Sequence, residues 1–293
     1  MDNYNPEHKE IKPYLSGYIR KAGLLLRRSA VPDDDAIHDI RVLMKKSRAT
    51  LKLTLPFTDT DLQTKDIQDL KRVGQIMSKW RDSSVHRMTI KELKKDLPHL
   101  FEKLKDNEKI ADLIKKPAAV TEADESLAID IDQIDSLLKK AGSRIRFYQL
   151  QKIDPAPLFN QLELTFENVR VVYLECRNRT KPEKMHELRK RSKDLLYQLY
   201  FFRPVNPPAV KSFEKRLEKL TLNLGRYNDL FQLLKALGYV YPGENSSPVM
   251  DELAIKIYER QDKYLSKVWP DAYKCFCPGT NLVNLLGFKL LVI

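Results

Sequence analysis

Glycine and cysteine are both scarce in this chain, and each shortage excludes a class of protein. Only 9 of the 293 residues are glycine, well below the usual share of about 7%, which argues against a fold rich in strands or loops. The three cysteines, Cys176, Cys275 and Cys277, form no paired framework and suit a reducing cytoplasm. Cys275-x-Cys277 lacks the further ligands of a zinc site, so we expect neither a metal nor another cofactor.

Long apolar runs are also missing. The N-terminus has no positively charged stretch followed by an apolar one, as a secretion signal requires. The C-terminal run from 282 to 293 is apolar, but it is interrupted by Asn284 and Lys289 and is too short to span a bilayer. We therefore expect no membrane insertion and predict that this run packs against the rest of the protein.

Helices are the elements that the remaining sequence favours. The 16 prolines divide the chain into segments of mostly about 20 to 40 residues, in which apolar residues recur with the 3.6-residue period of a helix. The sequence therefore predicts an all-α fold of long helices and helical hairpins.

Acidic residues are outnumbered by basic ones. The chain has 52 Lys and Arg against 40 Asp and Glu, which gives a net charge of +12 and a pI of about 9.4. Such an excess favours a polyanionic partner, which could be nucleic acid, a membrane surface or a phosphate polymer. A basic protein can carry this charge for solubility alone, but here the charge is concentrated in a repeated motif.

The repeated motif is His-x-x-Arg-x-x-x-Lys, which occurs at His38 and again at His186. A second block follows each copy at nearly the same distance. Asp82 of Trp80-Arg81-Asp82 lies 44 residues after His38, and Asp229 of Tyr227-Asn228-Asp229 lies 43 residues after His186. Two blocks with matched spacing predict a tandem duplication.

Each motif places a basic edge beside an apolar stripe. At about 100° per residue, a helix through the first copy gathers His38, Arg41, Lys45, Arg48 and Lys52 along one edge. The second copy repeats this edge only in part, because Leu196 and Tyr200 stand in place of Arg48 and Lys52. We therefore expect the second basic face to be shorter.

The chain divides into two halves that can each supply about four helices, enough to close a bundle. The segment from 120 to 138 contains six acids and no Lys or Arg, which predicts a connector or an acidic helix that packs on a basic neighbour. We expect repeats at about 8–118 and 157–270, a connector at 119–156 and a C-terminal tail at 271–293. The two motif helices are predicted to face a shared basic cleft around an approximate two-fold axis.

These residues resemble the CHAD family, the conserved histidine α-helical domain. The resemblance rests on both His-x-x-Arg motifs, on Arg81-Asp82 and on Gly225-x-x-x-Asp229, and it extends from about residue 8 to residue 270. It implies one domain of two pseudo-symmetric four-helix bundles with a basic cleft between them. It also implies binding of inorganic polyphosphate and, in some members, targeting to polyphosphate granules.

Carried over to this sequence, the resemblance implies a set of basic phosphate contacts in both halves. The first group comes from the motifs themselves: His38, Arg41, Lys45, Lys46, Arg48, His186, Arg189, Lys190 and Lys193. The second group consists of arginines seven residues apart on the helix before each motif, placed by repeat logic alone: Arg20, Arg27, Arg170 and Arg177.

The chemistry of these side chains suits a phosphate polymer. Arg offers a planar fork to two phosphate oxygens, and Lys acts as a mobile point charge. A nucleic-acid-binding helical protein is the first alternative, although it should interleave stacking aromatics with its basic residues. A metal-dependent phosphohydrolase using His38 and Asp39 is the second, but it needs further ligands, and we expect a binding protein rather than an enzyme.

Overall fold

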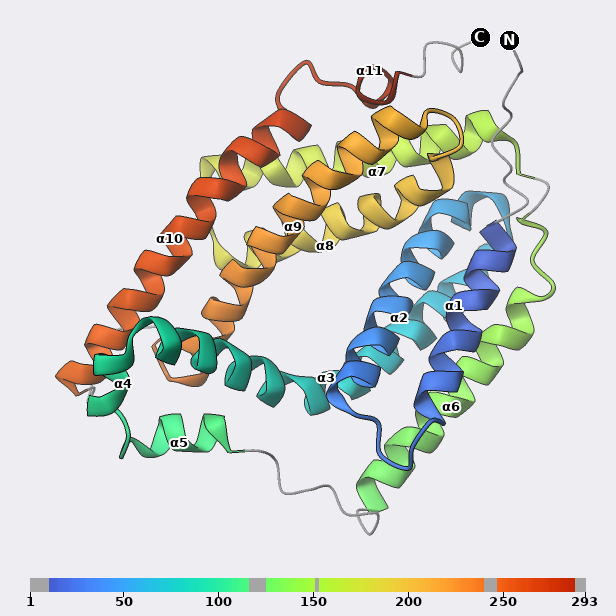
Figure 1. Cartoon of the computed structure of the whole chain (residues 1–293). Coiled ribbons are helices and arrows are strands. Elements are labelled where there is room, and N and C mark those ends of the chain that lie inside the picture. Colours follow the sequence, from blue (N-terminus) through green and yellow to red (C-terminus); the bar gives the residue numbers. More distant parts are fainter. Residues whose placement is uncertain (1–10, 116–124, 151–152, 240–246, 288–293) are drawn as a thin grey trace.

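The computed structural model describes residues 11–115, 125–150, 153–239 and 247–287, without the side chains of residues 81–83, 125 and 155. Every regular element within these ranges is a helix, which confirms the all-α prediction (Figure 1). The predicted boundaries at residues 8 and 118 fall outside the described ranges.

Four helices of the first half contact one another in a closed ring. The first, α1, packs on α2 and α6, and α3 packs on the same two helices. An aspartate begins two of them: Asp33 accepts a hydrogen bond from the Ala36 amide (2.7 Å), and Asp59 does so from the Leu62 amide (3.0 Å). The four helices are α1 (Ile11–Leu26), α2 (Asp34–Thr54), α3 (Thr60–Asp96) and α6 (Glu125–Ile145).

From Glu125 onward the acidic segment belongs to α6, which lies within the stretch expected as a connector and packs on helices of the first half. Arg144 of α6 donates to Asp66 (2.6 Å) and Asp69 (2.5 Å) of α3, and Asp135 pairs with Arg27, the residue directly after α1. Asp66 is fully buried and also accepts a hydrogen bond from Tyr148 (2.5 Å). Because a buried carboxylate is costly without such partners, this network fixes α6 to α3.

The second half has its own four long helices, and a proline stands at the start of each. Proline fits a first helical turn because the amide it lacks has no partner there. Contacts join α7 to α8, α8 to α9, α9 to α10 and α10 to α7. These helices are α7 (Pro155–Asn178), α8 (Pro182–Leu199), α9 (Pro207–Ala236) and α10 (Pro248–Phe276).

The C-terminal segment packs on the second half. Helix α10 continues through Pro270, so the residues from 271 to 276 that we assigned to a tail belong to this helix. Beyond it, α11 (Leu282–Leu286) contacts α9 and buries Leu282 and Leu286. The rest of the apolar run, residues 288–293, lies outside the described ranges.

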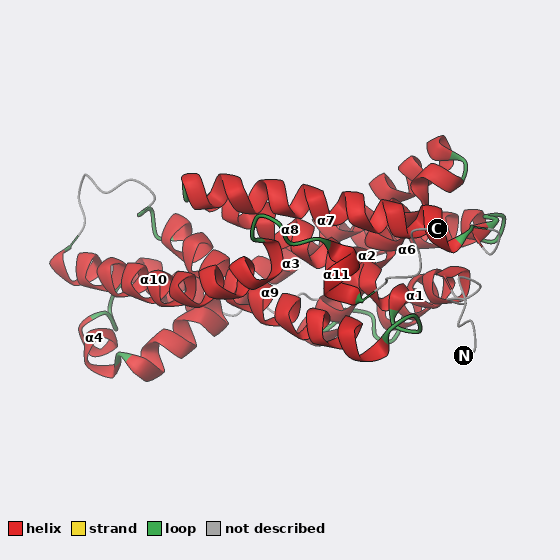
Figure 2. Ribbon diagram, turned by 90° about the horizontal axis from the view of Figure 1, so that it is seen from above, coloured by secondary structure: helices red, strands yellow, loops and turns green. Residues whose placement is uncertain are grey.

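The two halves meet along α2 and α8, and along α3 and α9. The Gln198 amide of α8 donates to the Ala49 carbonyl of α2 (3.0 Å), and Lys52 pairs with Asp194 (2.6 Å). Helix α3 is about 55 Å long at the usual rise, and it extends from the first half toward α10 (Figures 1 and 2). At that end the short α4 (Pro98–Lys103) contacts both α3 and α10, while α5 (Glu108–Ile114) packs on α3.

Candidate functional site

A pocket of about 550 Å³ lies where α2, α3, α8 and α9 come together. Its size falls within the roughly 300–1,000 Å³ of pockets that take small ligands. Among the described residues that line it, Asp229 is the one acid, against three histidines, His38, His86 and His186. Six of the described lining residues are lysines or arginines: Arg41, Lys45, Arg48, Lys71, Arg189 and Lys190.

Helix α2 contributes the first motif copy as predicted from its helical spacing. The Asp33 cap and the acids Asp34 and Asp35 in the first turn favour the start of this helix, so the motif begins one turn inside it. The Arg41 guanidinium crosses to α3, where it donates to the Gly74 carbonyl (2.8 Å) and the Ser78 hydroxyl (2.5 Å). Arg41 is therefore held in place before any ligand binds.

Helix α8 contributes the second copy, and a glycine of α9 makes room for it. A Cβ atom added at Gly225 would lie 3.2 Å from Nε of Arg189, closer than side chains ordinarily approach. Glycine therefore lets the Arg189 guanidinium lie against the backbone of α9. Nδ1 of His186 lies 2.9 Å from Oδ1 of Asn228, which also belongs to α9. This hydrogen bond orients the imidazole ring.

Two arginines of the pocket retain unused hydrogen-bonding capacity. The Nε atoms of Arg48 and Arg189 are buried and have no hydrogen-bond partner among the described residues. A buried donor without a partner costs about 1–3 kcal/mol, so an acceptor from a ligand would offset this cost. Lys190 differs, because its ammonium already donates to Glu187 (2.9 Å).

The surroundings of the pocket disfavour the charged forms of its basic side chains. Burial, followed by the neighbouring cations Arg189, Arg41, Arg48 and Lys193, lowers the pKa of Lys45 from its ordinary 10.5 to about 7. Burial likewise lowers the pKa values of Arg48 and Lys193. Desolvation of the ring lowers the pKa of His186, although its hydrogen bond with Asn228 opposes the shift. Such mutual repulsion favours an anion in the pocket.

The model of the CHAD domain family matches residues 19–238 of the 293 in the chain. The chain belongs to the CHAD domain family. No curated protein shows significant sequence similarity to the chain.

Two predicted lysines of this CHAD domain contact aromatic rings beside the pocket and are not among the residues that line it. The Lys46 ammonium lies 5.7, 5.9 and 5.6 Å from the ring centres of Tyr18, Tyr197 and Tyr200. Lys193 lies 5.8 Å from the ring of Tyr197. Such distances allow cation–π attraction, so both lysines have partners within the protein.

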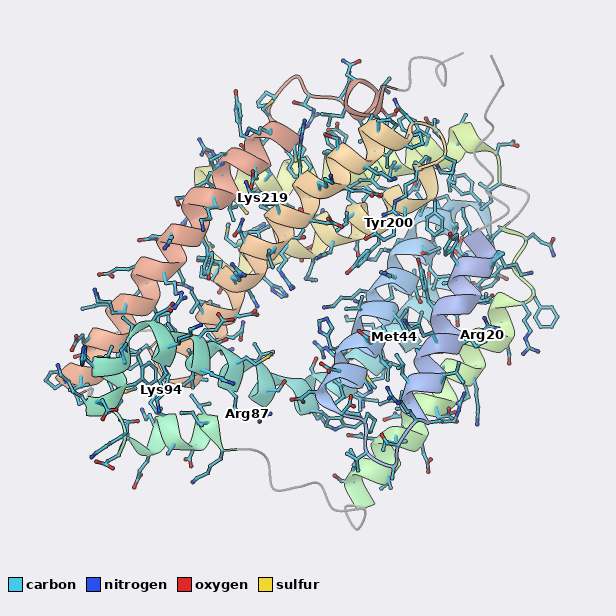
Figure 3. All side chains as sticks on the ribbon, in the orientation of Figure 1. Arg20, Met44, Arg87, Lys94, Tyr200 and Lys219 are labelled. Carbon is cyan, nitrogen blue, oxygen red and sulfur yellow. The ribbon has the colours of Figure 1, made fainter. Side chains whose placement is uncertain are left out.

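The four arginines placed by repeat logic do not line the pocket either. Figure 3 shows Arg20 on α1, on the side of the first half away from α8 and α9. Arg27 pairs with Asp135 of α6, and Arg177 lies 5.6 Å from the ring of Trp269 on α10. Arg170 pairs with Glu167 and donates to the Thr280 carbonyl (2.9 Å). No described residue of α1 or α7 lines the pocket, so these four arginines lie apart from the motif residues that do.

Helix α3 supplies pocket residues that the sequence did not single out. From the sequence alone, Lys71 is most simply interpreted as part of a solvent-exposed face. In the structure it lines the pocket with Gln75, Ser78 and His86. The signal in the sequence was weak, because these side chains join the motif residues only where α3 crosses between the halves. Of the second motif block, Asp229 lines the pocket, whereas the side chains of Arg81 and Asp82 lie outside the described part.

Neither a metal cluster nor a membrane span appears in the described part of this CHAD domain. Its residues offer no group of three or more His, Cys, Asp or Glu side chains that could hold a metal ion. None of its helices is long and apolar enough to cross a bilayer.

Proposed function

We propose that this CHAD domain binds inorganic polyphosphate, or a closely similar polyanion, in the pocket between α2, α3, α8 and α9, without catalysing a reaction. One observation carries the proposal. Six lysines and arginines line one pocket, five of them from the two copies of the motif and Lys71 from α3, and Asp229 is the one acid among the described lining residues. A ligand with repeated negative charges relieves their mutual repulsion.

Phosphate chemistry fits the donors that are present. Polyphosphate carries about one negative charge per phosphate and has no bases to read, so its recognition depends on closely spaced cationic donors and on release of its counterions. Arg48 and Arg189 offer buried Nε donors from opposite halves of the chain. A polyphosphate molecule that accepts hydrogen bonds from both donors would link the two halves of the protein.

The duplication and the bundle architecture are part of this proposal. Each half contains a ring of four contacting helices, and one motif helix from each half lines the pocket. This arrangement supports two repeats related by an approximate two-fold axis. In the second half Leu196 is buried and Arg203 lies 4.1 Å from the ring of Tyr200, so we infer that the first copy contributes more of the binding.

Nucleic acid is the less favoured partner. The described residues that line the pocket include no Phe, Tyr or Trp on which a base could stack. Cytoplasmic location, at polyphosphate granules when these are present, is the placement we infer for a domain that binds this polymer.

Competition binding tests the proposal. Labelled polyphosphate is titrated with the protein at a fixed salt concentration, and unlabelled polyphosphate or duplex DNA of equal charge is added as competitor. We expect polyphosphate to compete far better than DNA. Equal or better competition by DNA would favour the nucleic-acid alternative.

A double variant then tests the site itself. Arg48→Ala with Arg189→Ala removes two charge-assisted contacts and should weaken binding by about 100-fold, at about 1.5 kcal/mol or more for each contact. Lys211→Ala with Lys215→Ala is the matched control, because both lysines are exposed on α9 and lie outside the pocket. If the control loses as much affinity as the pocket variant, binding depends on overall charge and the site assignment is wrong.

A further inference from the structure

A second, smaller groove adjoins the basic pocket. It has a volume of about 250 Å³ and lies between α3, α9 and α10. Val85 and Asp229 line both the groove and the basic pocket, so a ligand can reach from one into the other. At this volume the groove falls below the roughly 300–1,000 Å³ of pockets that hold an entire small ligand. It suits one part of a ligand that is anchored next to it.

The walls of this groove differ in character from those of the basic pocket. Four apolar side chains besides Val85 line it, and two of them, Met88 of α3 and Leu222 of α9, are 50% and 55% exposed. Exposed apolar side chains that gather at one groove often mark a binding surface. Two acids, Glu92 and Asp229, also line it, so a continuing polyphosphate chain would meet apolar and negatively charged walls.

An exposed arginine lies over an aromatic ring at the same groove. The Arg226 guanidinium lies 5.7 Å from the ring centre of Tyr264. Arg260, which also lines the groove, donates to Asp96 (2.5 Å), so its charge already has a partner. A guanidinium plane that rests on an aromatic ring offers its other face for stacking.

We propose, on the basis of the polyanion binding inferred above, that the groove accepts the base of a nucleoside polyphosphate whose phosphates occupy the basic pocket. A nucleobase has two flat apolar faces and a polar edge, which matches the combination of Met88, Leu222 and the Arg226 plane. Thr89 and Glu92 provide acceptors in the same wall for base or ribose donors. The phosphates reach the cations of α2 and α8 past Val85 and Asp229.

Two ligands with the same number of phosphates test this assignment. Inorganic tripolyphosphate and adenosine triphosphate are titrated by calorimetry at matched salt without divalent cations. Tripolyphosphate has an additional ionisable oxygen, so a purely electrostatic site prefers it. We expect the wild type to bind adenosine triphosphate about tenfold more tightly than tripolyphosphate, since contacts to one base contribute about 1–3 kcal/mol.

A charge-neutral double variant isolates the groove. Met88→Gln with Leu222→Gln changes two exposed side chains and no charge, so it should remove the preference for the nucleotide and leave tripolyphosphate binding unchanged. Ile255→Gln is the matched control, because Ile255 is 56% exposed on α10 and lies outside the groove. Circular dichroism establishes that all three proteins are folded.

The outcomes separate this inference from the proposed function. A wild type that prefers tripolyphosphate, or a preference that the Met88→Gln and Leu222→Gln variant retains, overturns the base site but leaves polyphosphate binding intact. A wild type that binds neither ligand overturns both.

Discussion

Lys45 makes the clearest quantitative prediction, because its charge depends on whether the pocket is occupied. The pKa of about 7 in the free protein comes from burial and from the cations Arg189, Arg41, Arg48 and Lys193. A bound polyanion reverses the repulsive effect and raises this pKa toward the ordinary 10.5. Binding is therefore accompanied by proton uptake.

The sign and size of the pH dependence follow from this shift. At pH 8 a group with a pKa of about 7 is protonated in about one molecule in ten, so binding takes up about 0.9 proton per site. Affinity is highest below the free pKa and falls as the pH rises toward the bound pKa. For a bound pKa above about 9.5, the loss between pH 7 and pH 9 is about 40- to 50-fold.

Isothermal titration calorimetry in buffers of different ionisation enthalpy measures the proton uptake directly. The matched variant is Lys45→Arg, which keeps the positive charge but does not titrate in this range. We expect its affinity for polyphosphate to change by less than about threefold between pH 7 and pH 9. If the wild type and Lys45→Arg show the same pH dependence and the same proton uptake, the electrostatic account of the pocket is refuted.

Replacing both His38 and His186 with Gln should flatten the pH dependence of polyphosphate affinity near pH 6 and leave most of the salt dependence, as measured by titration from pH 5.5 to 8.5; an unchanged profile would mean that the histidines are structural. Gly225→Ala should displace Arg189 and weaken binding by about tenfold, whereas Gly17→Ala on α1, with nothing within 4 Å of the added Cβ and no place in the described lining of the pocket, should bind as the wild type does. Equal affinities for the two glycine variants would show that Arg189 does not contact the ligand. Affinity should fall with salt at a logarithmic slope of about −4 if about six phosphates are neutralised, and a slope near zero in fluorescence titrations would contradict ionic recognition.

The helices could be predicted from the sequence because their signals are local. Scarce glycine, proline spacing and the 3.6-residue period indicate an all-α chain without reference to tertiary structure. The motif faces of α2 and α8 were predictable for the same reason, since His38, Arg41, Lys45 and Arg48 share one side of a helix. That side is where the pocket lies.

The remaining features depend on contacts between distant segments. Lys71 belongs to the pocket only because α3 crosses between the halves. Arg27 and Arg177 hold corresponding positions in the two repeats. Their spacing does not reveal that Asp135 lies beside Arg27 and Trp269 beside Arg177. The position of α6 in the first half depends on partners about 75 residues away in the chain, such as Asp69 for Arg144.

The crossing of α2 and α8 also makes Lys45 a reporter of folding. Arg189 and Lys193, two of the cations that lower its pKa, belong to the second half of the chain. When the first half emerges from the ribosome, these neighbours have yet to be synthesised, and the amine of Lys45 titrates more like an ordinary lysine. Docking of the halves adds these two cations and so lowers its pKa further. Chemical labelling of Lys45 at neutral pH, where an unprotonated amine reacts fastest, would therefore time this last step of assembly in a refolding experiment.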